Sequence, residues 1–211
     1  MINRACIIRL SRYRQTLIRL KTLNFVKVFS ENLANSAGIT AMLVRKDFSL
    51  IGISGNKRGG YQIDDLITVI DNILGKDKIQ KFVVIGIGNI GRALLNYPNF
   101  KQIGIELAAG FDVDTAKHNR ESAIPILPVD ELGKFVKKHG IRFGIISVPE
   151  AEAQNTLEIM VQTGIKGILN FAPICLKEQP GCVVNNLHLE TEIENIIYFT
   201  NAEEKARSLN V

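Results

Sequence analysis

The stretch "KFVVIGIGNIGRALLNY", residues 81–97, constrains the fold more than any other part of the chain. The apolar run at residues 82–85 is typical of a buried strand, and it leads directly into Gly86-x-Gly88-x-x-Gly91 and a helical pattern. A glycine motif between a strand and a helix predicts a dinucleotide-binding turn. Gly86 would form the tight turn, Gly88 would let the backbone approach a pyrophosphate, and Gly91 would allow close packing of helix on strand.

An acidic residue at the end of the next expected strand indicates which dinucleotide fits. "IELAAGFDVD", residues 105–114, is strand-like and contains Asp112, 21 residues beyond Gly91. An acid about 20 residues after the motif binds ribose hydroxyls, and its charge would repel a 2′-phosphate. We therefore expect NAD(H) as the cofactor, with Asp114 as the alternative acid. The expected phosphate-binding loop comprises Gly86, Ile87, Gly88, Asn89, Ile90 and Gly91.

Strand and helix patterns alternate through the rest of this region. Helices are expected over residues 130–140 and 150–164, and strands over residues 142–148 and 166–172. This alternation predicts an α/β fold with a parallel, doubly wound sheet. Ligands of such sheets bind at the carboxyl ends of the strands, so the two loops after these strands are expected to line a nicotinamide pocket. The candidate residues in these loops are Val148, Pro149, Asn170 and Phe171.

The N-terminal region has the pattern of a helix-turn-helix. An amphipathic helix is expected over residues 4–20, followed by a short helix that starts at Ser30 as N-cap and stops at Gly38. Thr40 would cap a second short helix that runs to about residue 50. Two short helices joined by a turn with glycine form a helix-turn-helix. On the second helix Ala41, Arg45 and Lys46 share one face, Met42 and Val44 flank that face, and Phe48 turns toward the core.

A basic, glycine-rich segment follows the second helix. "ISGNKRGGYQI", residues 53–63, has strand-forming residues around a tip that contains Lys57 and Arg58, which predicts a β-hairpin. Residues 1–63 hold 11 Lys and Arg but only two acids, a net charge of +9. A winged helix with this charge predicts binding to double-stranded DNA, with the helix cations in a major groove and Lys57 or Arg58 along the backbone or minor groove. A solvated basic face without a ligand is the alternative.

The remaining segments divide the chain. A helix over residues 61–75 is expected to connect the DNA-binding domain, 1–78, to the dinucleotide domain, 79–185. The segment 186–211 has more apolar positions than one helix face of a monomer needs, which favours a helix swapped between two subunits over one that docks within its own subunit. The three cysteines lack C-x-x-C spacing, so neither a disulfide framework nor a metal site is expected. No apolar run is long enough for a membrane span, and we expect a cytoplasmic protein.

The sequence favours binding over catalysis. Hydride-transfer enzymes usually place an acid or base beside the nicotinamide. None of the three histidines, His118, His139 and His188, lies at the carboxyl end of an expected strand. Lys166 and Lys177 remain as alternative acid–base groups, but the chain leaves little room for a substrate domain. We therefore expect a protein that is not an enzyme.

Several motifs occur together in the order seen in one family. "VRKDFS" with the basic wing, "VIGIGNIGRALLNYPNF", "FDVD" and "GIKGILNFAP" make nearly the whole chain resemble the Rex family of redox-sensing transcriptional repressors. The resemblance implies a homodimer with winged-helix heads, NAD(H)-binding bodies and swapped C-terminal helices. It also implies binding to palindromic operators and release by NADH. Carried over, Arg45 and Lys46 read bases, and Tyr97 lies near the nicotinamide.

The chain departs from the family pattern at two positions that bear on coupling. Family members can link the tyrosine to an arginine on the first helix and to an aspartate on the swapped helix. The matching positions here are Gln15 and His188, so we expect a partial redox switch. The alternative functions are a small NAD-dependent dehydrogenase, or a nucleotide- or CoA-binding subunit, in which the basic head serves oligomerisation.

Overall fold

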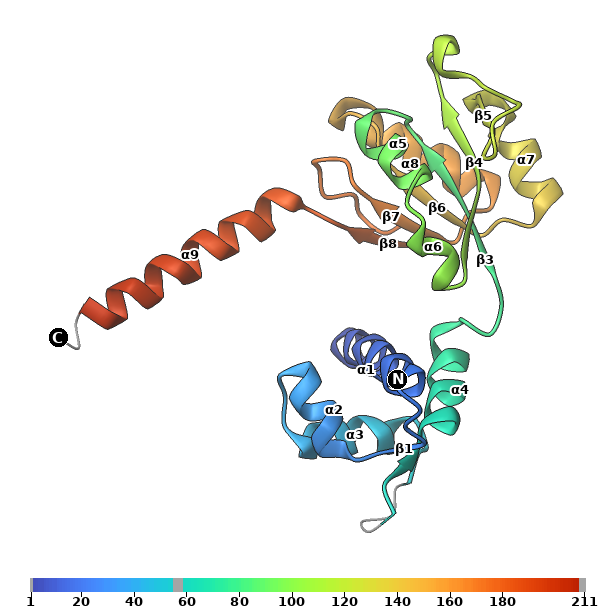
Figure 1. The fold of residues 1–211 in the computed structure, drawn as a ribbon. Helices are drawn as coiled ribbons and strands as arrows, with labels where there is room; N and C mark the ends of the chain where they lie inside the picture. Colours follow the sequence, from blue (N-terminus) through green and yellow to red (C-terminus); the bar gives the residue numbers. More distant parts are fainter. Residues whose placement is uncertain (1, 55–58, 209–211) are drawn as a thin grey trace. The chain divides into compact units, whose positions relative to one another are not determined.

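A computed structural model describes residues 2–54 and 59–208 and divides the chain into two units, Met1–Ile79 and Gln80–Val211 (Figure 1). The N-terminal unit contains the helices α1 (Arg4–Thr22), α2 (Ser30–Ala37), α3 (Ala41–Leu50) and α4 (Ile63–Leu74), and the strands β1 (Lys27–Val28) and β2 (Tyr61–Gln62). The positions predicted for all four helices are confirmed to within two residues.

The turn between α2 and α3 follows local sequence chemistry. Gly38 ends α2 in the left-handed region with φ of +65°, which glycine adopts at little cost. Thr40 caps α3, and its side chain accepts a hydrogen bond from the backbone N–H of Leu43. The predicted cap of α2 is wrong by one residue. Phe29 is the N-cap, and its N–H donates to the side chain of Asn32 at 3.1 Å, while Ser30 is the first residue of the helix.

One hydrophobic cluster holds the N-terminal unit together. Fully buried side chains come from α1, α2, α3 and α4 and include Leu10, Tyr13, Leu17, Leu33, Val44, Phe48, Leu66 and Ile70. Phe48 faces this core as predicted. Val44 was predicted to flank the exposed face of α3, but it is fully buried, because it packs into the hydrophobic cluster of this unit.

The wing differs from its prediction. Strand β2 pairs with β1 in antiparallel register, Lys27 opposite Gln62 and Val28 opposite Tyr61. Residues 51–54 contain no strand, so within the described residues the partner of β2 is β1 rather than the segment before the glycine-rich tip. Lys57 and Arg58, the predicted wing cations, lie outside the described residues.

A buried carboxylate joins α1 to α3. The side chain of Asp47 is 1% exposed and accepts two hydrogen bonds from Arg9, both at 2.6 Å, and one from the Tyr13 hydroxyl at 2.8 Å. Burial alone would raise the pKa of Asp47, but the bonds from Arg9 and Tyr13 outweigh it and hold the pKa below its usual value. The carboxylate therefore stays charged and fixes the rotation of α3 relative to α1.

The C-terminal unit is a three-layer α/β structure. Its strands are β3 (Gln80–Ile85), β4 (Ile105–Asp112), β5 (Ile126–Pro128), β6 (Phe143–Ile146), β7 (Gly167–Asn170) and β8 (Val183–Asn186). They form one sheet in the order β5-β4-β3-β6-β7-β8, and each neighbouring pair is parallel. The parallel, doubly wound sheet is thus confirmed, with the strand order of the dinucleotide-binding fold. The short strands β5 and β8 had not been predicted.

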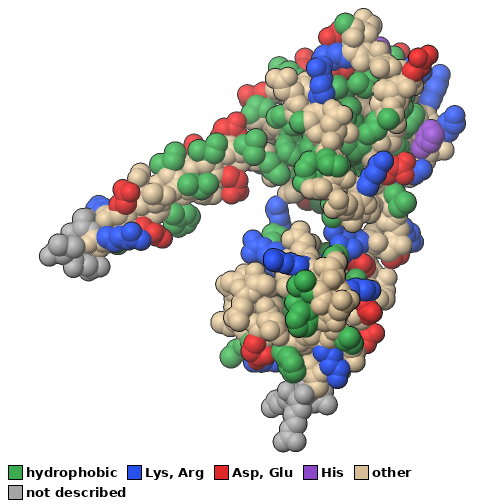
Figure 2. Space-filling model, viewed as in Figure 1, with side chains coloured by type: hydrophobic (Ala, Val, Ile, Leu, Met, Phe, Trp, Pro, Cys, Tyr) green, Lys and Arg blue, Asp and Glu red, His purple; other side chains and the backbone are tan. Residues whose placement is uncertain are grey.

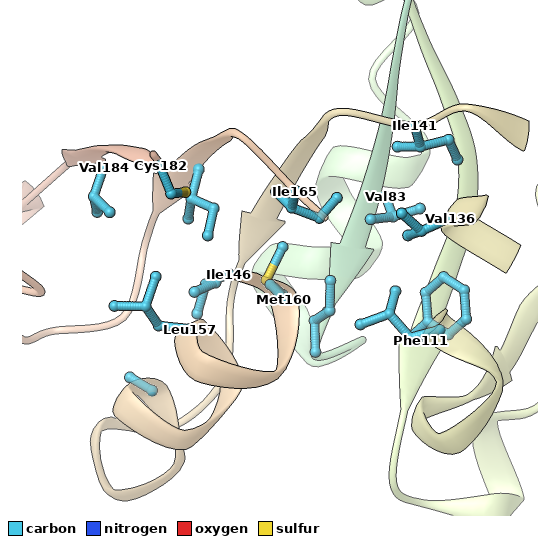
Figure 3. Packing of buried hydrophobic residues seen from close by; sticks show 14 of the residues in the cluster. Val83, Phe111, Val136, Ile141, Ile146, Leu157, Met160, Ile165, Cys182 and Val184 are labelled. Atoms are coloured by element: carbon cyan, nitrogen blue, oxygen red, sulfur yellow. The ribbon is translucent and has the colours of Figure 1, made fainter. Parts of the chain in front are cut away.

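Helices cover both faces of this sheet (Figure 1). The helices are α5 (Asn89–Leu95), α6 (Asn99–Gln102), α7 (Leu132–His139) and α8 (Glu150–Thr163), with short 3₁₀ turns at Thr115–Lys117 and Val129–Glu131. Val83 and Phe111 pack with Val136 of α7 and Met160 of α8 (Figure 3). Val84 points to the opposite face, into a second cluster with residues of α5 and α6. This alternation follows from the two-residue period of a strand.

The last helix, α9 (Leu189–Ser208), leaves its apolar side chains uncovered (Figure 2). Six large hydrophobic residues on it are each more than half exposed: Leu189, Ile193, Ile196, Ile197, Tyr198 and Phe199. Docking of this segment within its own subunit, the alternative considered above, would cover these side chains.

We predict that Asp47→Ala destabilises the N-terminal unit by about 2–4 kcal/mol, because Arg9 and Tyr13 lose their shared acceptor. The value lies below that of a fully buried pair, since the Arg9 side chain is 18% exposed. Hydrogen exchange followed by mass spectrometry at increasing urea would measure the loss. Asp64→Ala is the control, because Asp64 pairs with Lys21 at an exposed site and its loss should cost less than about 1 kcal/mol. Equal effects of both changes would contradict the role given to Asp47.

We further predict that two glycines of the same motif, Gly88 and Gly91, differ in how well they tolerate a side chain. A Cβ at Gly91 would lie 2.1 Å from the backbone oxygen of Gly86, so Gly91→Ala should destabilise the C-terminal unit by about 1–3 kcal/mol or more. A Cβ at Gly88 would meet nothing within 4 Å, and Gly88→Ala should change stability by less than about 0.5 kcal/mol. Calorimetric unfolding of both variants tests the pair; an unaffected Gly91→Ala protein would show that the loop packs differently.

Candidate dinucleotide site and nucleic-acid interface

The glycine turn lies where the strand order of the sheet reverses. Strand β3 is central, β4 lies on one side of it and β6 on the other. Gly86 follows β3 with φ of +90°, a conformation that side chains disfavour. A Cβ at Gly86 would also lie 2.6 Å from the backbone oxygen of Ser147, just after β6. In turn, the Ser147 hydroxyl donates to the backbone oxygen of Gly86 at 2.8 Å, so the loops after β3 and β6 hold each other.

A cavity of about 400 Å³ opens at this point. It is lined by Ile85, Gly86, Gly88, Asp112, Val113, Asp114, Lys117, Val129, Leu132, Ser147, Val148, Pro149, Glu152, Asn155, Thr156 and Ile159. The lining comes from the carboxyl ends of β3, β4 and β6, and from α7 and α8, which is where ligands of such sheets bind. A cavity of this volume is in the range of ligand sites in proteins.

The structure brings five of the predicted cofactor-binding residues together around this cavity: Gly86, Gly88, Asp112, Val148 and Pro149. The other loop residues lie differently. The side chain of Ile87 is fully buried in the cluster under α5, so only its backbone faces the loop. Asn89 and Ile90 are exposed in the first turn of α5, where backbone N–H groups have no intrahelical partner.

Asp112 is anchored to the glycine loop. Its Oδ2 accepts from the backbone N–H of Ile87 at 2.7 Å and from Lys117 Nζ at 2.9 Å, and its Oδ1 accepts from the N–H of Asp114 at 2.9 Å. Burial raises the pKa of this carboxyl, but the bonds from Asp114, Lys117 and Ile87 together lower it below the usual value. Asp112 is therefore a fixed anion at the end of β4.

Asp114, the alternative acid, has a local role. Its Oδ1 accepts from the N–H of Ala116 at 3.0 Å and caps the 3₁₀ turn Thr115–Lys117. It lies 3.9 Å from Lys117 Nζ and also lines the cavity. Asp112 rather than Asp114 contacts the glycine loop.

Sequence reasoning missed part of the lining. Val113, Val129, Leu132 and Ile159 form an apolar wall that is suited to a planar base. The polar residues Lys117, Glu152, Asn155 and Thr156 were also missed. The position of Lys117 could have been predicted from the sequence, because a cation three residues after Asp114 and five after Asp112 can reach either acid. The residues of α8 could not have been predicted, since their approach to the cavity depends on how the helix packs on the sheet.

Three further candidates, Tyr97, Asn170 and Phe171, do not line this cavity. Tyr97 is half-exposed after α5, and its hydroxyl accepts from the Asn99 amide at 3.1 Å. The side chain of Asn170 is fully buried and donates to Ile174 O at 2.7 Å and to Asn186 Oδ1 at 2.9 Å, which organises the loop after β7. Phe171 packs in the cluster under α5 and α6.

The N-terminal unit presents the predicted face of α3 to solvent. Arg45 and Lys46 are exposed, Ala41 is half-buried beside them, and Met42 is 74% exposed. Lys46 forms no ion pair within the described part of the chain. Arg45 donates to Ser30 Oγ at 2.8 Å and to Glu31 Oε1 at 3.2 Å. A helix of this kind can place Arg and Lys against the base edges of a major groove.

Neither a membrane span nor a metal-binding cluster is found in the described residues. In residues 2–54 and 59–208, none of the helices is both long enough and apolar enough to cross a bilayer. No group of three His, Cys, Asp or Glu side chains in these ranges could hold a metal ion.

Two family models match consecutive parts of the chain. Residues 1–49 match the putative DNA-binding protein N-terminus, and residues 77–174 match the CoA binding domain. The two matches correspond to the helix-turn-helix region and to the sheet that carries the cavity.

Whole-length relatives connect both parts. The chain is 37% identical over 205 residues to the redox-sensing transcriptional repressor Rex of Desulforamulus reducens, which covers 97% of this chain and 98% of the relative. It is similar to the crystal structure of RSP in complex with β-NAD⁺ and operator DNA, with a TM-score of 0.91, 31% identity and coverage of 100% of this chain and 97% of that one. The complex of RSP with β-NADH gives a TM-score of 0.85 at 31% identity and covers 99% of each chain.

These relatives are transcriptional repressors. They therefore give no support to the alternative functions, a small dehydrogenase or a nucleotide- or CoA-binding subunit. Because relatives with more than 30% identity match nearly the whole chain, the chain belongs to the Rex family of redox-sensing transcriptional repressors.

Proposed function

We propose that this protein represses transcription by binding a palindromic operator through its N-terminal unit, and that NADH bound in its C-terminal unit releases it. The observation that carries the proposal is the cavity at the strand-order reversal, where a charged Asp112 is tied to the glycine loop. The relatives that bind NAD⁺ with operator DNA, and NADH, support it.

The cavity fits the adenosine half of NAD(H). One acceptor position of Asp112 Oδ1 remains for a ribose hydroxyl, because a carboxylate oxygen can accept two hydrogen bonds and Oδ1 accepts one. The pyrophosphate would lie over Gly88 and the first turn of α5. Asp112 and Asp114 together outweigh the charge of Lys117, which disfavours the extra phosphate of NADP(H).

The nicotinamide would extend beyond the cavity along the ends of β6 and β7. We propose that Val148 and Pro149 contact it and that Tyr97, Asn170 and Phe171 lie on its other side. Because the Asn170 amide already donates to Ile174 in the loop after β7 and to Asn186 of β8, its contribution would be to hold that loop in place.

For DNA, we propose that Ala41, Arg45 and Lys46 face the major groove and that Lys57 or Arg58 contacts the backbone or minor groove. The exposed cations of α3 and the net charge of the first 63 residues support this assignment. We further propose that residues 1–78 act as the DNA-binding domain and residues 79–185 as the NAD(H) domain, in the cytoplasm where the operator is accessible.

We also propose that the protein is a homodimer in which residues 186–211 swap between subunits. The exposed apolar side chains of α9 support a partner subunit as their cover. A dimer matches a palindromic operator, since two heads would occupy half-sites about one helical turn apart.

We predict that NADH weakens operator binding and that NAD⁺ does not. Duplexes selected from a randomised palindromic library with the wild-type protein would serve as the operator, and fluorescence anisotropy with each nucleotide would give the affinities. Because linkage is reciprocal, operator DNA should weaken NADH binding by the same factor. With Gln15 and His188 at the coupling positions, we expect a factor below the roughly 10⁴ of a complete switch.

Gly88→Ala is the matched control for this measurement, because a Cβ at Gly88 faces open space and leaves the fold intact. It would block the approach of the pyrophosphate, so NADH should lose its effect while operator affinity stays unchanged. If NADH binds the wild-type protein tightly and operator affinity does not move, the proposed release is wrong.

Ile196→Glu should convert the protein to a monomer. Ile196 is 68% exposed in the chain alone, so a charge there costs little in folding, but it would be buried unpaired in a dimer interface. Sedimentation velocity of the variant and the wild type tests this. Asn201→Glu is the control, because Asn201 is exposed on the same helix but lies five residues from Ile196 and therefore on a different face. A dimeric Ile196→Glu protein would exclude this face of α9 from the interface.

A further inference from the structure

Two residues of α2 hold the guanidinium of Arg45. Arg45 Nη1 donates to Ser30 Oγ at 2.8 Å and to Glu31 Oε1 at 3.2 Å. The Ser30 hydroxyl donates to Glu31 Oε2 at 3.3 Å, which closes a triangle of three side chains. A hydrogen bond from its own backbone N–H, together with those from Arg45 and Ser30, lowers the pKa of Glu31, so the carboxylate is charged when it meets Arg45.

The contacts of Arg45 use only one of its nitrogens. Within the described residues both bonds are made through Nη1, and Nε and Nη2 make none. Bidentate recognition of guanine O6 and N7 needs two neighbouring N–H groups in one plane. The Nε–Nη2 edge supplies two such groups without breaking the bonds to α2.

Ser30 is a buried polar residue whose hydroxyl bonds to Arg45 and Glu31. It is 5% exposed, and it is not the cap of α2, because Phe29 occupies that position. A buried hydroxyl needs hydrogen-bond partners, and the partners of Ser30 are Arg45 and Glu31. The side chains of Arg45 and Glu31 are 53% and 64% exposed, so the pair lies at the surface and can be approached by DNA.

We propose that Ser30 and Glu31 are positioning residues for base recognition: they fix Arg45 through Nη1 and present its Nε–Nη2 edge to a guanine in each half-site. This inference rests on the proposed DNA-binding function. An arginine ordered before binding loses less side-chain freedom when it meets its base, and a fixed fork accepts fewer alternative geometries. Glu31 and Ser30 therefore act on specificity through Arg45 rather than by touching DNA.

Selection from a library of palindromic duplexes with randomised half-sites tests this inference. Arg45→Ala should lose the preference for guanine at one position of each half-site. Glu31→Ala should weaken the preference at the same position by about two- to fivefold, the size expected for one exposed ion pair. Glu31→Gln keeps an acceptor for Nη1 and should fall between the wild type and Glu31→Ala.

Asp64→Ala is the matched control. Asp64 is also an exposed acid of the N-terminal unit, 73% exposed and paired with Lys21, so its loss changes the net charge equally without touching α3. It should raise affinity for all duplexes and leave the sequence preference unchanged. The double change Glu31→Ala with Arg45→Ala should show no more loss of preference than Arg45→Ala alone.

The outcomes separate the inference from the function on which it rests. If the wild-type protein selects an operator and Glu31→Ala behaves like Asp64→Ala, or alters a position other than that of Arg45, the positioning role is wrong and the repressor function stands. Additive loss in the double variant would likewise overturn the inference. If the wild-type protein selects no sequence, the proposed function itself fails.

Discussion

A buried carboxylate must be compensated by partners or it loses its charge, and each unit of this protein is organised around one such group. Asp47 is held by Arg9 and Tyr13, and Asp112 by Lys117 and two backbone N–H groups. In both cases the hydrogen bonds lower a pKa that burial alone would raise. The partners come from different elements, so each charge fixes the position of one element relative to another.

This arrangement links stability to function within each unit. Asp47 lies on the same helix as Arg45 and Lys46 but on its buried side, so the bond to α1 determines which side chains of α3 face outward. Asp112 lies at the end of β4 and bonds to the N–H of Ile87, so it supports the same glycine loop that would bind a pyrophosphate. Since both carboxylates have lowered pKa values, their stabilisation is present near neutral pH and is lost as pH falls through those values.

Close backbone approach has a similar role in the C-terminal unit. Gly86 and Gly91 lie so near to Ser147 and to each other that a side chain at either position would overlap backbone atoms. Gly88, by contrast, faces open space. Gly86 and Gly91 are therefore needed by the fold, whereas Gly88 leaves open space beside its backbone. A glycine motif alone does not make this distinction.

The sequence by itself determined the elements whose cause is local. Periodicity and turn chemistry predicted the cap at Thr40, the stop at Gly38 and the glycine turn, because neighbouring residues decide them. The four helices of the N-terminal unit and the strands β3, β4, β6 and β7 followed in the same way. The position of Asp112 at the end of β4 also followed, since its distance from the glycine motif is set by one strand–helix–strand unit.

The tertiary structure decided what depends on packing between distant segments. Val44 is buried because it packs into a cluster with side chains from distant segments. Strand β2 pairs with β1 across more than thirty intervening residues, and local patterns do not predict such a pairing. The strands β5 and β8 lie at the two edges of the sheet, where each is fixed by pairing with its one neighbour, β4 or β7. Folding also brings Arg45 to Ser30 and Glu31, and it places α7 and α8 along the wall of the cavity. The sequence contains these residues but does not show that they meet.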